Sequence, residues 1–565
     1  MKRWNFIEHD MERVEAFSKE TGLSRLIAAL LIARGYGDPD SAQKFLNPSY
    51  EDLHDPYLLK DMDRAVKRIF RAVEDREKIL VWGDYDVDGT TGTVVLRKAL
   101  EMIGAESGYH VPHRFTEGYG LNIPALENAR NEGYKLVITV DCGSTSFEPI
   151  SWAKENDVDV IVTDHHLTKD EGLPEAFAVV NPNRPDCGYP DKHLAGVGVA
   201  FKLAHALLRE RGRESAVPHF LKVVAIGTIA DVMMLTGENR AIVTAGLNEI
   251  SSTVNYGLKA LIEVADCRDE MTALDIGFRV APRINAAGRM DAARHVVELF
   301  ESEDFGEARK LAEYLNRKNI ERQKLQKTIT EKALHSALEN GGADSRFIVV
   351  YGEGWHRGVI GLAASKVAEK LHRPSIVISV EDGMGHGSAR SVSGYHLLKG
   401  LDTCSDLFET YGGHAAAAGM QIRPENIEEL SDRLNRHAAQ EISQDDLIPE
   451  IRIDAPVSSA TLGLELTKEL KNLEPFGQGN PKPVFATGGL TLVDEPWVMK
   501  EKHLKLKLRD DDGRPFEAVW WDGVERSAEL ELRSGQEYEL AYTPEENTWR
   551  GVTRLQLNIK DIKHK

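Results

Sequence analysis

The segment that decides the fold is Ile79-Leu-Val-Trp-Gly-Asp-Tyr-Asp-Val-Asp-Gly89, an apolar run followed by acidic residues at alternate positions. A short continuous apolar run is typical of a strand buried on both faces of a parallel sheet. The runs 136–140, 158–163 and 178–180 have the same character, and helix-like stretches separate them. This alternation over residues 75 to 235 predicts an α/β domain with a mainly parallel sheet.

Acidic residues follow three of these runs at the point where each strand is expected to end. Asp84 and Asp86 follow the first run, Asp141 follows the second, and Asp164-His165-His166 follows the third. Because ligands of parallel sheets bind beyond the carboxyl ends of the strands, we expect these side chains to meet in one crevice. Carboxylates and imidazoles without thiols favour Mg²⁺ or Mn²⁺ over zinc, and paired carboxylates can bridge two ions for phosphoester hydrolysis. The pattern therefore favours a metal-dependent phosphoesterase.

The first acidic segment has two other interpretations. Asp84-x-Asp86-x-Asp88-Gly89 fits the start of a calcium loop, but the twelfth position is Val95 instead of Glu, and the preceding residues are strand-like. Asp88 with Gly89 can also form the turn that leads into a helix from Thr90 onward. A further acid, Asp231, ends an apolar stretch and by itself resembles a helix-terminal aspartate.

Length and composition limit the class of protein. With 565 residues, the chain is expected to form about four domains at roughly 150 residues each. The net charge of −20 means that any affinity for nucleic acid must be local, and it predicts exclusion of duplex DNA from the outer surface. The sequence has no run of about 20 apolar residues, and its four cysteines are far apart. We therefore expect a cytoplasmic protein, with Cys142 as a buried thiol.

The sequence pattern divides the chain into five segments. Residues 302 to 340 are rich in helix formers and predict one long helix, whose basic residues form either a solvated face or a wall facing DNA. In residues 503 to 509, leucines alternate with Lys505, Lys507 and Arg509, as in a strand with one buried face. The predicted segments are an N-terminal helical segment 1–48, an α/β domain 49–300, a connecting helix 301–342, a second α/β domain 343–447 and a β barrel 448–565.

Several motifs in a fixed order resemble those of a known superfamily. Residues 83–89, 141–143, 163–166 and 227–231 are similar to the motifs of the DHH phosphoesterase superfamily. The rest of the chain resembles the RecJ family of bacterial single-strand-specific exonucleases, over nearly the whole length. The further motifs are Pro112–Leu121, Pro282–Arg289, Gly354–Gly361, Gly387–Ser391 and Gly412–Gly419.

The resemblance implies a fold and a metal centre. The implied fold is α/β, with a DHH-type mainly parallel sheet domain joined by a long helix to a DHHA1-type α/β domain, and a C-terminal OB-like β barrel. The implied cofactor is Mn²⁺, or Mg²⁺, as one or two ions. Some smaller relatives have a metal-binding His where this chain has Leu80, which leaves the occupancy open. The implied metal ligands are Asp84, Asp86, Asp141, His165 and Asp231, and with His166 these are the implied catalytic residues.

The resemblance also implies residues that bind the substrate. Arginine suits a terminal phosphate because its planar fork forms two hydrogen bonds, and exposed glycine N–H groups can add an anion nest. A basic strand of the β barrel could guide single-stranded DNA, although an exposed polar face is the alternative. The implied residues are Arg114, Arg283, Arg289, Trp355, His356, Ser388, Arg390, Gly412, Gly413, His414, Lys505, Lys507 and Arg509.

These features together lead to one expected function and two rivals. The family implies a metal-dependent exonuclease that hydrolyses single-stranded DNA from the 5′ end to 5′-mononucleotides, in DNA repair and recombination. It also implies cooperation with a helicase and a single-strand-binding protein, and the chain could act as a monomer. The first rival is a DHH phosphatase acting on nanoRNA or a cyclic dinucleotide, which usually lacks the terminal barrel. The second is a non-catalytic DNA-binding scaffold, which the presence of all the acids and both histidines disfavours.

Overall fold

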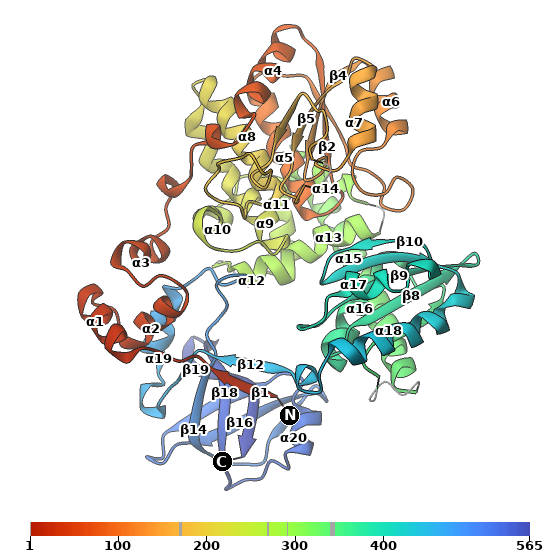
Figure 1. Ribbon diagram of the computed structural model, residues 1–565. Helices are drawn as coiled ribbons and strands as arrows, with labels where there is room; N and C mark the ends of the chain where they lie inside the picture. Colours follow the sequence, from red (N-terminus) through yellow and green to blue (C-terminus); the bar gives the residue numbers. More distant parts are fainter. Residues whose placement is uncertain (1, 169–171, 268–269, 291, 340–344, 565) are drawn as a thin grey trace.

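The chain folds into two α/β domains and a C-terminal β domain, which Figure 1 shows at the top, on the right and at the bottom. This computed structural model describes residues 2–168, 172–267, 270–290, 292–339 and 345–564. The predicted fold class is confirmed: a mainly parallel sheet comes first, a second α/β domain follows, and the C-terminal segment is rich in strands. No helix in these ranges combines the length and apolar character needed to cross a membrane.

The first α/β domain is built on a parallel sheet with the strand order β3-β2-β4-β5-β6. Four of its strands follow the predicted apolar runs. The fifth, β3, was not predicted, because its sequence Ser-Gly-Tyr-His is polar and only half-buried. Helices α5 and α8 cover one face of the sheet, and α6 and α7 cover the other. The bounds are α4 Met62–Glu74, β2 Lys78–Gly83, α5 Val87–Met102, β3 Ser107–His110, α6 Ile123–Asn131, β4 Tyr134–Val140, α7 Phe147–Glu155, β5 Asp159–Thr163, β6 Ala178–Val180 and α8 Gly196–Glu210.

Helices complete this domain and lead into the predicted connector. The long helix α15 spans Phe305–Glu339, in agreement with the long helix predicted over residues 302 to 340, of which residue 340 lies outside the described residues. Many of its basic side chains pair with acids one turn away, such as Lys310 with Glu307 at 2.7 Å. Such pairs favour the solvated face over a DNA-facing wall. The other helices are α9 Leu221–Ala230, α10 Gly237–Ile250, α11 Tyr256–Val264, α12 Ala273–Asp275, the π-helix η4 Ile276–Val280, α13 Ala281–Arg289 and α14 Arg294–Glu301.

The second α/β domain has a five-stranded sheet with the order β10-β11-β9-β8-β7. Only β7 and β8 pair in parallel, and the other neighbours are antiparallel. Helix α16 packs against α15 and the sheet through a shared apolar cluster. The bounds are β7 Ile348–Glu353, α16 Arg357–Leu371, β8 Ser375–Glu381, β9 Met384–Arg390, α17 Leu397–Asp402, β10 Phe408–Gly413, β11 Ala417–Ile422 and α18 Ile427–Glu441.

The C-terminal β domain contains a seven-stranded sheet with the order β13-β14-β18-β19-β17-β16-β15. Strand β14 also pairs with β16 through two residues, so the sheet curves back toward itself. Strand β16 spans His503–Arg509 with its leucines buried, as the alternation predicts. The other bounds are β12 Glu450–Ile453, β13 Ala455–Pro456, α19 Leu464–Lys471, β14 Phe485–Leu492, β15 Trp497–Met499, β17 Pro515–Trp520, α20 Val524–Glu529, β18 Glu537–Trp549 and β19 Val552–His564.

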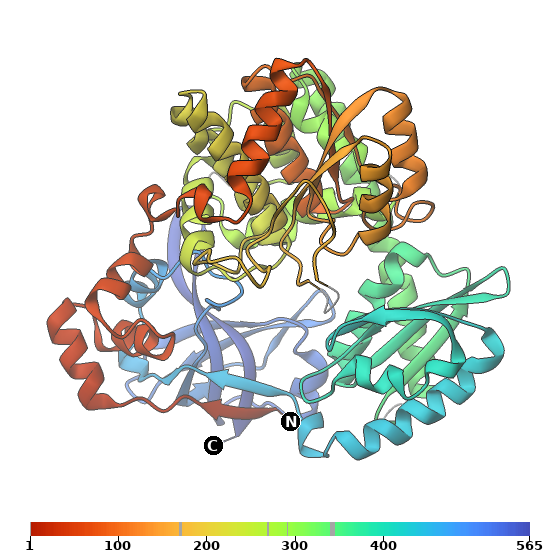
Figure 2. The same cartoon turned by 45° about the horizontal axis from the view of Figure 1, so that its top comes forward.

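The N-terminal segment joins the far end of the chain. Strand β1, Arg3–Phe6, was not predicted, and it pairs in parallel with β12. The segment predicted to be helical contains the helices α1 Met11–Thr21, α2 Arg25–Ala33 and α3 Pro39–Leu46. They share an apolar core with the C-terminal β domain, in which Phe17 and Phe45 belong to the same cluster as Phe485. Figure 2 shows them against the blue strands, although the first α/β domain follows them in sequence.

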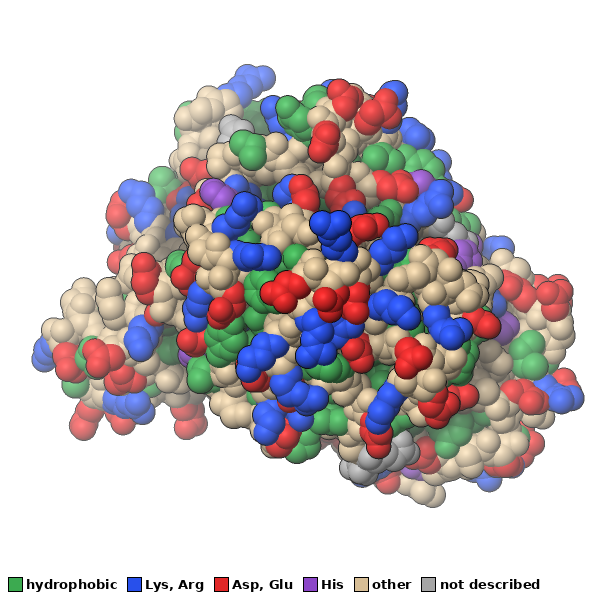
Figure 3. Space-filling model, turned by 90° about the horizontal axis from the view of Figure 1, so that it is seen from above, with side chains coloured by type: hydrophobic (Ala, Val, Ile, Leu, Met, Phe, Trp, Pro, Cys, Tyr) green, Lys and Arg blue, Asp and Glu red, His purple; other side chains and the backbone are tan. Residues whose placement is uncertain are grey.

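The surface agrees with the expectation that binding of polyanions must be local. Figure 3 views the molecule from above, and basic and acidic side chains are mixed over that face without a wide area of one sign. The net charge of −20 therefore does not gather into a single acidic field on this side.

Candidate metal centre and basic pocket

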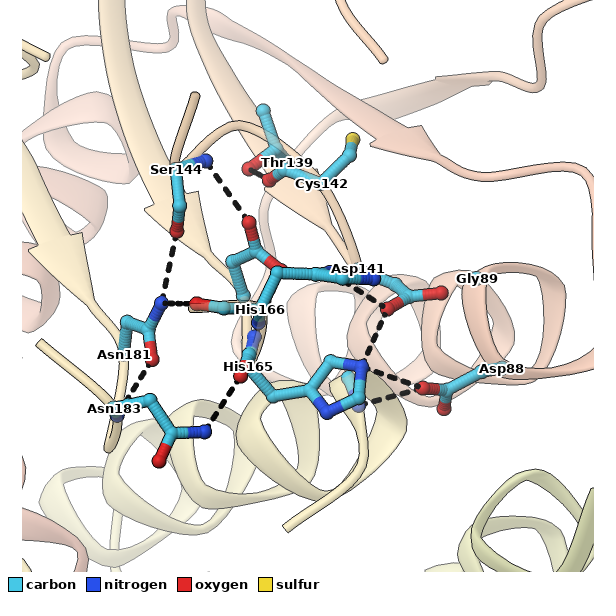
Figure 4. Close-up of polar contacts among 12 residues, drawn as sticks. Asp88, Gly89, Thr139, Asp141, Cys142, Ser144, His165, His166, Asn181 and Asn183 are labelled. Carbon is cyan, nitrogen blue, oxygen red and sulfur yellow. Dashed lines mark hydrogen bonds and ion pairs between the residues drawn. The ribbon is translucent and has the colours of Figure 1, made fainter. Parts of the chain in front are cut away.

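The acidic residues at the strand ends converge at one edge of the first sheet. Asp84 follows β2, Asp141 follows β4 and Asp164 follows β5, and all three are buried. Asp86 caps α5, accepting a hydrogen bond at Oδ1 from the Gly89 N–H at 3.0 Å, which is why the helix begins earlier than predicted. Figure 4 shows the side chains of Asp141 and His165 pointing toward one another.

His165 lies among three carboxylates. Its Nε2 atom is 3.1 Å from Oδ1 of Asp141, 3.6 Å from Oδ2 of Asp231 and 3.8 Å from Oδ2 of Asp88. Burial and then the charge of His166 lower the pKa of His165 to about 4. The imidazole is therefore neutral near pH 7, which is the form that ligates a metal ion.

The carboxylates of the cluster are buried close together and repel one another. Burial and the charge of Asp86 raise the pKa of Asp84 to about 8 and that of Asp231 to about 7. Burial and neighbouring acids also raise the pKa of Asp141 and Asp88 well above the ordinary value. Oδ1 of Asp84 is buried and accepts no hydrogen bond from the described residues. Carboxylates that repel one another, together with a neutral imidazole, are suitable ligands for a hard divalent cation such as Mn²⁺ or Mg²⁺.

Three overlapping sets of side chains could hold an ion. Within each set, the ligand atoms lie within 4.8 Å of one another. All five implied metal ligands belong to one set or another, and so does His166. The sets are Asp84, Asp86 and Asp141; Asp141, His165 and His166; and Asp88, His165 and Asp231.

His166 is held in the opposite protonation state to His165. Its Nδ1 atom lies 2.8 Å from Oδ1 of Asp164, which also accepts a hydrogen bond from the backbone N–H of His166 at 3.1 Å. Burial lowers the pKa of His166, but the hydrogen bond and charge of Asp164 outweigh it and raise the pKa to about 9. The ring is therefore charged at neutral pH and has a proton to donate.

Two asparagines fix the loop that carries both histidines. The Asn181 amide donates to the His166 carbonyl and to the Ser144 hydroxyl, each at 2.9 Å, and the Asn183 amide donates to the His165 carbonyl at 2.6 Å (Figure 4). The sequence prediction did not include these asparagines. Both follow the end of β6, so the strand-end signal that pointed to the acids could also have found them.

The implied metal ligands and catalytic residues did not include Asp88, nor Asp164, although Asp164 was expected in the same crevice. Asp88 is 1% exposed, and its carboxylate accepts hydrogen bonds from the N–H groups of Gly196 and Val197, at 2.6 and 2.7 Å, at the start of α8. The turn interpretation of Asp88 missed this contact, because it joins residues more than a hundred positions apart. The predicted buried thiol of Cys142 is confirmed, with the side chain fully buried.

A basic pocket of about 540 Å³ lies between the two α/β domains. Tyr85, between Asp84 and Asp86 in sequence, lines it, so the pocket adjoins the metal cluster. Arg114 lies 4.7 Å above the Tyr85 ring. Burial and then the charge of Arg114 lower the pKa of Arg289 to about 10, so this guanidinium remains charged at neutral pH. The lining includes no carboxylate and consists of Tyr85, Arg114, Phe115, Arg289, Arg357, Gly358, Ile360, Gly361, His386, Gly387, Ser388, Arg390, Thr410, Tyr411, Gly412, Gly419, Met420 and Gln421.

Five of the predicted substrate-binding residues line this pocket: Arg114, Arg289, Ser388, Arg390 and Gly412. They come from motifs that are distant in sequence. The sequence prediction did not include the lining residues Tyr85, Phe115, Arg357, His386, Tyr411 or Gln421. All but His386 and Gln421 are direct sequence neighbours of predicted residues.

The other predicted residues of the two α/β domains lie elsewhere. Arg283 donates to Asn316 Oδ1 at 3.0 Å and to the Arg279 carbonyl at 2.6 Å, outside the lining. Trp355 is 7% exposed and packs in the core between α15 and α16. His356 accepts a hydrogen bond from Gly358 N–H as the cap of α16. Gly413 and His414 are exposed beside the turn from β10 to β11.

The basic strand β16 is partly neutralised by its neighbours. Lys505 pairs with Glu517 at 2.8 Å, and Lys507 pairs with Asp494 at 3.2 Å. Arg509 is exposed at the end of the strand. These pairs favour the interpretation as an exposed polar face over a dedicated anion site.

Comparisons with known proteins identify the three parts of the chain. Residues 78–228 match the DHH family N-terminal domain, residues 344–440 match the DHHA1 domain, and residues 453–561 match the RecJ OB domain. The single-stranded-DNA-specific exonuclease RecJ of Bacillus subtilis is 38% identical over 99% of this chain and 70% of its own length. The protein of the same name from Escherichia coli is 35% identical over 96% of both chains.

Solved structures agree with these matches. The crystal structure of RecJ in complex with Mn²⁺ from Thermus thermophilus superimposes with a TM-score of 0.85 at 29% identity, over 100% of this chain and 80% of that one. A crystal structure of exonuclease RecJ bound to manganese gives a TM-score of 0.61 at 34% identity, over 69% of this chain and 98% of that one. The order of the strand-end motifs, the three matched domains and the full-length relatives place this chain in the RecJ family.

Proposed function

We propose that the chain is a Mn²⁺- or Mg²⁺-dependent exonuclease that removes 5′-mononucleotides from the 5′ end of single-stranded DNA. The observation that carries this proposal is the position of Tyr85, which lines the basic pocket and lies between two acids of the metal cluster in sequence. It connects a group of carboxylates that repel one another to a pocket whose arginines face no carboxylate in the lining. The first attracts cations, the second attracts phosphate, and they adjoin. The names of the full-length relatives supply the polymer class, single-stranded DNA.

The residues of the cluster have separate roles in this proposal. Asp84, Asp86, Asp141, His165 and Asp231 would hold one or two ions, which when bound supply Lewis-acid activation of water and of the phosphoryl oxygens. Since Nδ1 of His166 is hydrogen-bonded to Asp164, Nε2 is the nitrogen that can donate a proton to the leaving oxygen. Asp164 keeps that proton in place at neutral pH.

The pocket holds the end of the DNA. A terminal phosphate has more charge and more free oxygens than an internal one, and Arg114, Arg289 and Arg390 can each form charge-assisted hydrogen bonds to it. Tyr85, Phe115 and Tyr411 give the same pocket aromatic faces for a base.

The test is a turnover assay with Mn²⁺ on single-stranded DNA labelled at either end. We expect mononucleotides from the 5′-labelled end of long strands, slow turnover of dinucleotides, and loss of activity in Asp141→Asn. Mononucleotides released first from the 3′ end would refute the polarity, and preference for a dinucleotide would favour the phosphatase. DNA binding without hydrolysis by the unaltered chain would favour the scaffold.

We also propose a cytoplasmic monomer that receives single strands from a helicase and from single-strand-binding protein. Both domains that line the basic pocket belong to one chain, which supports the monomer. The partners rest on the family resemblance. Light scattering of the purified protein and co-purification with tagged partners would test these points.

A further inference from the structure

A loop of the C-terminal β domain reaches into the first α/β domain beside a candidate metal ligand. We call residues 473–481, between α19 and β14, the clamp loop. The Leu235 N–H donates to the Gln478 carbonyl at 2.8 Å. Two glycines allow this approach: a Cβ at Gly477 would lie 2.6 Å from Cδ1 of Leu235, and one at Gly479 would lie 2.7 Å from Cε of Met234. The two segments are therefore in direct contact.

A buried arginine fixes the start of the clamp loop. Arg240, on α10, is 2% exposed and donates to the carbonyls of Leu473, Glu474 and Pro475 at 3.1, 2.6 and 3.3 Å. Within the described ranges it pairs with no carboxylate; backbone carbonyls accept its hydrogen bonds, and its guanidinium lies 3.7 Å from the centre of the Phe45 ring. Removing such contacts is costly, because the charge would be left without partners.

An asparagine folds the clamp loop onto itself. The Asn480 amide donates to the Leu473 and Pro475 carbonyls at 2.7 and 2.8 Å. From the N-terminal helical segment, Arg34 donates to Asn480 Oδ1 and to the Pro481 carbonyl. Hydrogen bonds thus hold both ends of the clamp loop, and the Gln478 carbonyl between these ends accepts the hydrogen bond from Leu235.

The segment it touches is strained. Asp231 ends α9, and the next residue, Val232, has a φ of 57°. A β-branched residue rarely adopts this left-handed conformation, and it persists only where the surroundings hold it. Val232 is 65% exposed, so its own packing does not supply that hold. The Leu235–Gln478 hydrogen bond lies three residues further along the same turn.

We propose that the clamp loop is a positioning element of the metal cluster. It holds the 231–236 turn, including the strained Val232, so that the Asp231 carboxylate stays within 3.6 Å of His165. The C-terminal β domain thereby determines how well the first α/β domain binds its metal. The inference rests on the proposed function for the identity of the cluster as a metal centre.

The first test compares two glycine variants of the full chain by calorimetric titration with Mn²⁺. Gly477→Ala pushes against Leu235, whereas Gly463→Ala, the matched control, has open space at its Cβ and an extended backbone. Loss of a residue that orients a metal ligand typically lowers metal affinity about 10- to 100-fold, so we expect a loss of this size in Gly477→Ala. We expect a change of less than about twofold in Gly463→Ala, and unchanged binding of single-stranded DNA in EDTA for both. Equal Mn²⁺ affinity in both variants would overturn the proposal.

The second test adds Val232→Gly to each background. Glycine adopts the left-handed conformation without strain, so the turn should need the clamp loop less. We expect Val232→Gly to restore at least half of the lost Mn²⁺ affinity, on a logarithmic scale, in the Gly477→Ala protein. Independent, additive effects would contradict the proposal.

A third measurement uses the unaltered protein and does not depend on the folding of any variant. In hydrogen exchange, the Leu235 amide should exchange slowly and become slower when Mn²⁺ binds. If Mn²⁺ does not change the exchange rate of the Leu235 amide, the proposed coupling between the clamp loop and the metal cluster is overturned. Calorimetric titration of Asp141→Asn with Mn²⁺ separates the proposed function from the proposed role of the clamp loop. If Asp141→Asn binds Mn²⁺ normally, the assignment of the metal cluster fails. If Asp141→Asn loses Mn²⁺ binding but Gly477→Ala binds Mn²⁺ normally, only the role of the clamp loop fails.

Discussion

The metal cluster and the basic pocket adjoin at Tyr85 and are built in opposite ways. In the cluster, burial and neighbouring carboxylates raise the pKa of Asp84, whereas in the pocket, burial and neighbouring arginines lower the pKa of Arg289. In both regions like charges are held together by the surrounding fold at a cost in stability, and binding the opposite charge relieves that cost. The fold therefore holds like charges close together in both the metal cluster and the basic pocket.

The two regions differ in what a change of pH does to them. Burial brings the pKa of Asp84 to about 8 and that of Asp231 to about 7, inside the physiological range. Burial leaves the pKa of Arg289 at about 10, above that range. Metal binding should therefore depend on pH through these carboxylates, whereas the charge of Arg289 in the pocket should not change over that range.

The largest effect is expected from removing one charge from the metal cluster. Asp141→Asn keeps a side chain that tolerates the left-handed backbone at φ 64°, so the fold should be retained. We expect kcat to fall by at least about 10³-fold, as for other catalytic residues. Because one repelling charge is gone, the melting temperature of the metal-free protein should rise, and added Mn²⁺ should no longer raise it further. Calorimetric scans with and without Mn²⁺ check this, and a lower metal-free melting temperature would contradict the stored repulsion.

A smaller effect is expected from the corresponding change in the basic pocket. Arg390→Met removes one charge-assisted contact, worth about 1.5–3 kcal/mol, so KM for single-stranded DNA should rise roughly 10- to 100-fold with less change in kcat. Arg283→Met is the control, because Arg283 lies outside the pocket and contacts Asn316. It should lower the melting temperature and leave KM unchanged. Equal KM changes in both variants would refute the assignment of the pocket.

The pH dependence sharpens the comparison further. Since the folded-state pKa values of Asp84 and Asp231 lie above the unfolded ones, the folded protein binds extra protons. The stability of the metal-free protein should therefore fall as pH rises from about 4 to about 8. Protons compete with the ion for both carboxylates, so Mn²⁺ affinity should rise by more than about tenfold between pH 6 and pH 8. Binding in EDTA of DNA that ends in a 5′-hydroxyl group should stay constant over that range, because a terminal phosphate, which would itself titrate at about pH 6, is absent. A parallel rise in both affinities would contradict the different pH responses of the two regions.

The smallest effect is expected on the basic strand β16. Lys507 is exposed and already paired with Asp494, so Lys507→Ala should weaken DNA binding by less than about twofold at physiological salt. Arg509→Ala, without a carboxylate partner among the described residues, should have the larger effect of the two. Anisotropy titrations at several salt concentrations check this, and a loss of more than tenfold in Lys507→Ala would make the strand a principal DNA site.

Much of the fold could be predicted from the sequence, because the buried parallel strands are apolar throughout and the connecting helix lacks breakers. The edge strand β3 and the N-terminal strand β1 could not, because each is short and gains its structure from a distant partner. Within the site, the acids at the strand ends were predictable from topology. Asp88 was not, since its hydrogen bonds to Gly196 and Val197 come from another part of the chain. The basic pocket could not be predicted as a whole for the same reason, because its lining residues come from both α/β domains.

The pairing of β1 with β12 has a consequence for how the protein is made. Residues 3–6 leave the ribosome well before their partner strand, which begins at Glu450. At about 5–20 residues per second, they wait on the order of half a minute to a minute and a half for it. During that time the apolar faces of α1 to α3 lack the β domain that later covers them. Residues 3–46 thus cannot reach their final place until the C-terminal β domain has been synthesised, and chaperones have that interval in which to bind them.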